Sequence, residues 1–160
     1  MIHTVILKMI DYNYGCPELV NHALKVYGFA KAIGEMEGLD ESTQEIIEIA
    51  ALTHDIGIKN SEKKYNSSAG NYQQIEGPPE AKKLLAELGI ESGVIDRVCW
   101  LIAHHHTYTD IQGIDYQILV EADFLANFYE DDMSIDSVHS AGGKMFKTLS
   151  GKAILNAIYS

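Results

Sequence analysis

The sequence is short of several residue types, and each shortage argues against a class of protein. Its two cysteines, Cys16 and Cys99, lie far apart and form no Cys-x-x-Cys pair, so neither a disulfide framework nor a thiolate zinc site is indicated. Arg97 is the only arginine, and 12 basic residues stand against 23 acidic ones, for a net charge of −11. Because binding to a nucleic-acid backbone depends on many lysines and arginines, we expect no nucleic-acid polymer as a partner.

Long hydrophobic runs are also missing. The apolar N-terminal stretch from Val5 to Ile10 is interrupted by Lys8 and has no small-residue cleavage site, so we interpret it as folded structure and expect neither a signal peptide nor a membrane span. This favours a cytoplasmic protein. The composition, 46% hydrophobic and 22% charged, fits one globular domain over residues 1–160. The oligomeric state stays open.

Apolar residues recur at helical spacing, and no segment shows the alternation typical of a half-buried strand. The predicted fold is therefore all-α, a single compact helical domain. The polar segment 58–77 is predicted to be a long surface loop. Helices are expected over residues 17–38, 40–55, 78–89, 92–104, 115–128 and 151–158, with Asp40, Ser92 and Asp115 as N-caps and Pro78-Pro79 opening the third helix.

Candidate metal ligands stand at the edges of the apolar segments. A mostly apolar run from Ile46 to Leu52 ends at His54-Asp55, which brings an imidazole and a carboxylate to the core boundary, where uncompensated polar groups cost free energy. An aspartate at a helix C-terminus also opposes the helix dipole. His22 lies on an apolar helix face, and Asp123 lies within another apolar helix.

Each of these residues also has an ordinary structural interpretation. A single histidine on an apolar face, such as His22, is usually a hydrogen-bonded core residue. Asp123 alone would fit a buried carboxylate bound by backbone amides, or a surface residue beside Glu121. The interpretation as metal ligands depends on the four residues converging in space, because the helices must pack with their apolar faces inward.

The order and spacing of these residues resemble the HD superfamily of metal-dependent phosphohydrolases, an all-helical family. The resemblance runs from His22 to Asn127, within a motif-bearing core of about residues 17–130. It is carried by four segments, N-H-A-L-K-V around His22, A-L-T-H-D-I-G at 51–57, L-I-A-H-H-H at 101–106 and V-E-A-D-F-L around Asp123.

This resemblance implies a set of ligands for a divalent metal ion, which would be Fe, Mn, Mg, Co, Ni or Zn. A first ion would be bound by His22, His54, Asp55 and Asp123. A second would share Asp55 and add His104 and His105, whereas His106 would contact substrate or support the ligands. Family members usually have a further histidine between these blocks; none lies between Asp55 and His104, and Glu76 is the nearest oxygen donor. If Glu76 replaces this histidine as a ligand, the second site would favour Mn, Mg or Fe. Alternatively, only one ion would bind.

The resemblance further implies hydrolysis of a phosphoester, in a small nucleotide or another phosphorylated metabolite, by attack of metal-bound hydroxide. Asp55 would orient or deprotonate the nucleophile, Lys59 would stabilise the developing charge, and Lys63 and Lys64 would contact the substrate. Lysines in such a segment also fit a solvated surface. Two alternatives remain, an HD-type di-iron oxygenase and a non-catalytic module that binds a metal or a nucleotide.

Overall fold

The computed structural model describes residues 1–160 as nine helices and no strand, which confirms the predicted all-α domain. The helices are α1 (Ile2–Tyr12), α2 (Pro17–Glu37), α3 (Glu41–Thr53), α4 (Ile58–Tyr65), α5 (Gly70–Glu87), α6 (Ser92–His104), α7 (Ile114–Glu130), α8 (Ile135–Met145) and α9 (Leu149–Ile158). None of them combines the length and the hydropathy needed to cross a bilayer.

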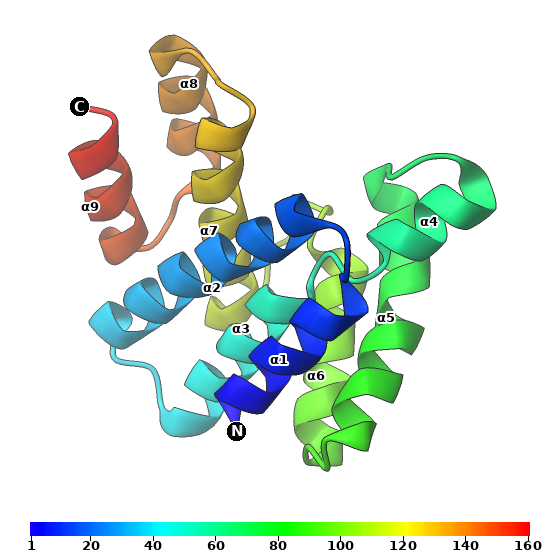
Figure 1. Ribbon diagram of the computed structural model, residues 1–160. Coiled ribbons are helices and arrows are strands. Elements are labelled where there is room, and N and C mark those ends of the chain that lie inside the picture. The colour runs from blue at the N-terminus through cyan, green and yellow to red at the C-terminus, as the bar shows by residue number, and fades with distance from the viewer.

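Helix α3 is the centre of the molecule (Figure 1). It packs against α1, α2, α6 and α7, and every residue from Ile47 to Thr53 is buried. The side chain of Asp40 caps its first turn by accepting a hydrogen bond from the Thr43 amide at 2.9 Å, as the sequence predicts. The buried end of α3 therefore delivers His54 and Asp55 to the middle of the fold.

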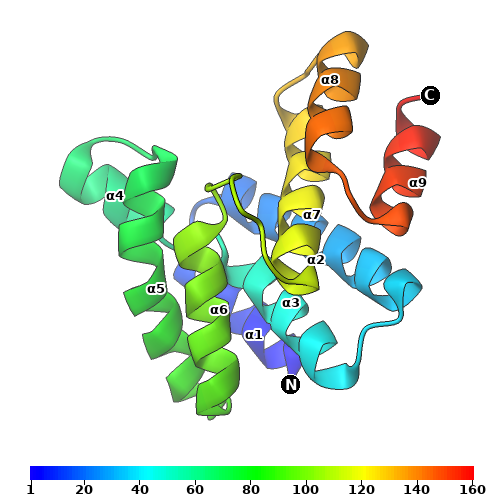
Figure 2. The same ribbon diagram turned by 180° about the vertical axis from the view of Figure 1, so that it is seen from behind.

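The other helices surround this centre in two groups (Figures 1 and 2). The antiparallel pair α5 and α6 lies on one side of α3, with α4 packed against α5. Helices α2 and α7 cover the other side, and α8 and α9 pack onto the outer part of α7. The space between the two groups is where residues from α2, α3, α6 and α7 meet.

The segment 58–77 differs from its prediction as a loop, because it forms α4 and the first turns of α5. Pro78 and Pro79 consequently lie inside α5 instead of at its start. Proline keeps φ in the helical range, but it removes the hydrogen bond to the carbonyl one turn earlier and its ring crowds that carbonyl. The burial of Ala81, Leu84 and Leu85 stabilises the helix beyond the prolines.

Two predicted caps are also corrected. Glu91 caps α6, accepting hydrogen bonds from the Gly93 and Val94 amides, and Ser92 is the first helical residue. Asp115 lies inside the first turn of α7 and forms a bidentate ion pair with Arg97, with both nitrogen–oxygen distances at 2.7 Å. The charged partner occupies both carboxylate oxygens, so Asp115 ties α7 to α6.

Candidate metal centre

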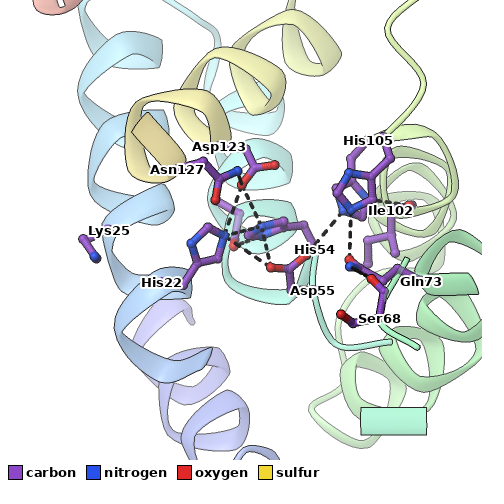
Figure 3. Close-up of polar contacts among 12 residues, drawn as sticks. His22, Lys25, His54, Asp55, Ser68, Gln73, Ile102, His105, Asp123 and Asn127 are labelled. Atoms are coloured by element: carbon purple, nitrogen blue, oxygen red, sulfur yellow. Dashed lines mark hydrogen bonds and ion pairs between the residues drawn. The ribbon is translucent and has the colours of Figure 1, made fainter. Parts of the chain in front are cut away.

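Four ligand-type side chains from three helices converge beside the end of α3 (Figure 3). The Nε2 atom of His22 lies 3.1 Å from Nε2 of His54, 3.1 Å from Oδ1 of Asp123 and 3.2 Å from Oδ2 of Asp55. His22, His54 and Asp123 are 8%, 0% and 5% exposed. We call this group of four residues the first cluster. The structure thus brings together the four residues predicted to bind a first ion.

The far nitrogen of each imidazole in the first cluster is bound to an acceptor. Nδ1 of His54 donates to the carbonyl oxygen of Ala51 at 2.7 Å, and Nδ1 of His22 donates to Oε1 of Glu130 at 2.6 Å. A proton fixed on Nδ1 leaves the Nε2 lone pair facing the cluster, the arrangement that supports metal-ligating histidines.

The electrostatics of the first cluster favour a bound cation. Burial opposes protonation of His22, but hydrogen bonds to Asp123 and Asp55 outweigh it and raise the pKa of His22 to about 11. Burial likewise fails to keep Asp123 neutral, because His22 and His54 hold its pKa well below the usual value. The cluster therefore stabilises a positive charge between its imidazoles and carboxylates. The donor set of two imidazoles and two carboxylates suits a divalent metal ion, which would take the place of the proton on Nε2 of His22.

A second cluster, comprising Asp55, His105 and His106, lies beside the first and shares Asp55 with it. Oδ2 of Asp55 faces the first cluster, whereas Oδ1 lies 3.4 Å from Nε2 of His105. Nδ1 of His105 donates to the Ile102 carbonyl at 2.7 Å, and its buried Nε2 has no hydrogen-bond partner. An orphaned ring nitrogen facing a carboxylate fits a position for a cation.

His106 is bound differently from the other imidazoles. Its Nε2 donates to Oε1 of Gln73 at 2.9 Å, and the Gln73 amide nitrogen donates to the Ser68 carbonyl at 2.6 Å. Burial and, to a smaller extent, the neighbouring His105 lower the pKa of His106 to about 4. His106 is therefore a neutral ring whose Nε2 carries the proton and whose Nδ1 holds the free lone pair.

The structure differs from the sequence-based expectation at His104. This residue ends α6, and its ring stacks back on Trp100 at a centroid distance of 4.0 Å, with Nδ1 donating to the Trp100 carbonyl. The next two residues leave the helix and turn towards Asp55. The second cluster therefore contains His105 and His106, in place of His104 and His105.

Glu76 is buried but joins neither cluster. Its carboxylate accepts hydrogen bonds from Lys64 Nζ at 2.9 Å and from the Tyr65 hydroxyl at 3.1 Å. The contact with Lys64 holds the pKa of Glu76 below its usual value. The residue of α5 that reaches the second cluster is Gln73, one turn earlier.

The lysines predicted to contact substrate are also placed away from the clusters or held by other groups. Lys59 donates to the Tyr12 carbonyl at 2.8 Å and lies over the Tyr12 ring. Lys64 is held by Glu76, and Lys63 is exposed in the last turn of α4. None of these contacts directs a lysine nitrogen towards Asp55.

Two supporting residues were missed by the sequence interpretation. Glu130 follows Asp123 by seven residues, two helical turns, so it lies on the same face of α7; that spacing is a usable signal. Gln73 had no such signal, because the segment that contains it was predicted to be a loop.

The chain was compared with known proteins. A family model described as "HD domain" matches residues 19–138, more than half of the chain. No functionally curated protein matches the sequence. The crystal structure of a predicted HD superfamily hydrolase from an uncultured Thermotogales bacterium is similar to this chain, with a TM-score of 0.67 at 20% sequence identity. The match covers 97% of this chain and 83% of that one, and it shows a shared fold.

Proposed function

The chain belongs to the HD domain family, and from this premise and the geometry of the two clusters we propose that it is a metal-dependent phosphohydrolase. The observation that carries the proposal is the convergence of two fixed Nε2 lone pairs and two carboxylates within 3.1–3.4 Å at the buried end of α3. The substrate is a small phosphorylated metabolite or nucleotide.

The residues have distinct roles in this proposal. His22, His54, Asp123 and Oδ2 of Asp55 would hold a divalent ion, which supplies a water of lowered pKa and polarises a phosphoryl oxygen. Asp55 also reaches the second cluster through Oδ1, so it can orient the attacking water while it binds the ion. Glu130 and the Ala51 carbonyl keep the two imidazoles in the tautomer that binds metal.

Lys59 was first expected to stabilise the charge that develops on the phosphoryl group. In this proposal the lysines near the clusters contribute little to that stabilisation. Lys59 and Lys64 are engaged by Tyr12 and Glu76, so charge on the phosphoryl group would be stabilised mainly by bound metal and by neutral donors. The half-buried His106 ring and the Tyr108 hydroxyl, 3.5 Å from Nδ1 of His106, are such neutral groups.

The proposal is tested with protein stripped by a chelator and reloaded separately with Mn, Co, Fe, Ni, Mg or Zn. Phosphate release from a panel of phosphomonoesters and nucleotides is expected with at least one metal, and it should be lost in His54→Ala. Asp96→Asn, an exposed aspartate of α6, is the matched control. Absence of turnover from the whole panel with every metal would overturn the proposal.

A second candidate, an HD-type di-iron oxygenase, is favoured by one observation, the bridging position of Asp55 between the two clusters. Two irons per chain and oxygen uptake with a diol or phosphonate substrate would support it. Tight binding of a nucleotide without turnover or oxygen uptake would instead indicate a binding module.

A further inference from the structure

A groove between α7 and α8 is not explained by the metal ligands. It has a volume of about 500 Å³ and is lined by Phe124 of α7 and by one face of α8 that includes Ser140, Lys144 and Met145. The groove is open to solvent and mixes aromatic, aliphatic and polar side chains. Such a surface suits the organic part of a small ligand.

The groove begins one residue from the first cluster. Phe124 directly follows Asp123 on α7, and consecutive residues of a helix point about 100° apart. Asp123 therefore points into the first cluster, while Phe124 forms the wall of the groove on the adjoining face. Phe124 thus places the groove on the same helix that carries a residue of the first cluster.

Tyr108 connects the second cluster to the same wall. Its hydroxyl lies 3.5 Å from Nδ1 of His106, and its ring centroid lies 5.2 Å from that of Phe124. Burial and, to a smaller extent, the negative charges of Asp123 and Asp55 raise the pKa of Tyr108 to about 12. Two aromatic rings thus form a continuous surface from His106 to the groove.

We propose that this groove is a specificity subsite, which binds a planar aromatic group of the substrate stacked on Phe124. The inference rests on the proposed function, because it assigns the organic part of the phosphoester that the clusters would hydrolyse. Aromatic rings stack favourably on phenylalanine. Lys144 and Asp136 both line the groove, and Lys144, which forms no ion pair, can make a cation–π contact with an aromatic ring bound there.

The test compares benzyl phosphate with cyclohexylmethyl phosphate on the manganese-loaded protein, because the two esters differ in the planar aromatic ring. The wild type is expected to prefer the benzyl ester by about tenfold in kcat/KM. Phe124→Ala should bring the ratio of the two kcat/KM values close to one, whatever its effect on the turnover of either ester. Ser140→Trp, which fills the groove from an exposed position on α8, should have the same effect, and Lys144→Met a smaller one.

Tyr129→Ala is the matched control, since Tyr129 is an exposed aromatic residue of the same helix that lies outside the groove. It should keep the full preference. Equal turnover of the two esters by the wild type would overturn the inference, as would a preference unchanged in both Phe124→Ala and Ser140→Trp. Either result leaves the proposed phosphohydrolase intact.

A binding measurement distinguishes failure of the proposed phosphohydrolase function from failure of the groove inference. If the wild type hydrolyses neither ester, calorimetry with benzylphosphonate and cyclohexylmethylphosphonate tests whether the groove binds the aromatic group. Tighter binding of the benzyl compound that disappears in Ser140→Trp supports the subsite, and equal binding of the two compounds overturns it.

Discussion

The two clusters share Asp55 but differ in how their imidazoles are held. In the first cluster, His22 and His54 have their Nδ1 atoms bound to fixed acceptors, and both Nε2 lone pairs face the carboxylates. In the second cluster, His105 follows this pattern, whereas Nε2 of His106 donates to Gln73. The first cluster offers a complete set of candidate ligands, and the second would be complete only if His106 changed its hydrogen-bond partner or bound a metal through Nδ1.

The largest effect is expected from Asp55→Asn, because this residue serves both clusters. The amide has nearly the same shape but removes a negative charge from each, so the metal content should fall to a small fraction of the wild-type value. Phosphoester turnover should fall on the order of 10³-fold. Elemental analysis and phosphate release measure the two quantities, with Asp96→Asn as the control. Wild-type metal content in Asp55→Asn would refute the assignment.

Glu130→Gln is expected to weaken only the first cluster. The substitution removes the charge that fixes the Nδ1 proton of His22, and loss of such a supporting partner lowers metal affinity by about 10- to 100-fold. Competition with a chromophoric chelator measures the change. Glu35→Gln, on the surface of α2, should bind metal like the wild type; equal affinity in Glu130→Gln and Glu35→Gln would show that Glu130 does not support the site.

The second cluster is tested by comparing His106→Ala with His104→Ala. Because His106 faces Asp55 and His104 stacks on Trp100, His106→Ala should reduce kcat/KM by about tenfold, and His104→Ala should leave it nearly unchanged. The opposite ranking would restore the assignment made from the sequence.

The smallest effect on metal binding is expected from Asp40→Ala, which lies outside both clusters. Hydrogen bonds from Thr43 lower the pKa of Asp40, so its stabilisation of α3 is present at neutral pH and is lost as the pH falls through that lowered value. Asp40→Ala should lower the thermal midpoint by about 2–4 °C at neutral pH, and the difference should disappear in strong acid. Unchanged metal content at neutral pH would confirm that capping and metal binding are independent.

Hydrophobic periodicity predicted α2, α6 and α7, which pack on α3, but it did not predict α1, which also packs there, or the polar helices α4 and α8. Helix α4, with the sequence Ile-Lys-Asn-Ser-Glu-Lys-Lys-Tyr, buries only Ser61, and α8 buries only Val138 and Gly142. Such polar helices are stabilised by the elements against which they pack, and the pattern of apolar residues does not reveal these packing partners.

The sequence by itself determined the first cluster and the helical class. A histidine or carboxylate on an apolar face must be compensated wherever that face is buried, which made His22, His54, Asp55 and Asp123 candidates. The resemblance to the HD superfamily then implied that they bind one metal ion. Only the tertiary structure decided which neighbours complete the site. The sequence does not tell whether the end of α6 turns His104 or His106 towards Asp55. Gln73 and Glu130 reach the imidazoles only because α5 and α7 pack beside them, and this packing depends on the assembled core and not on local sequence.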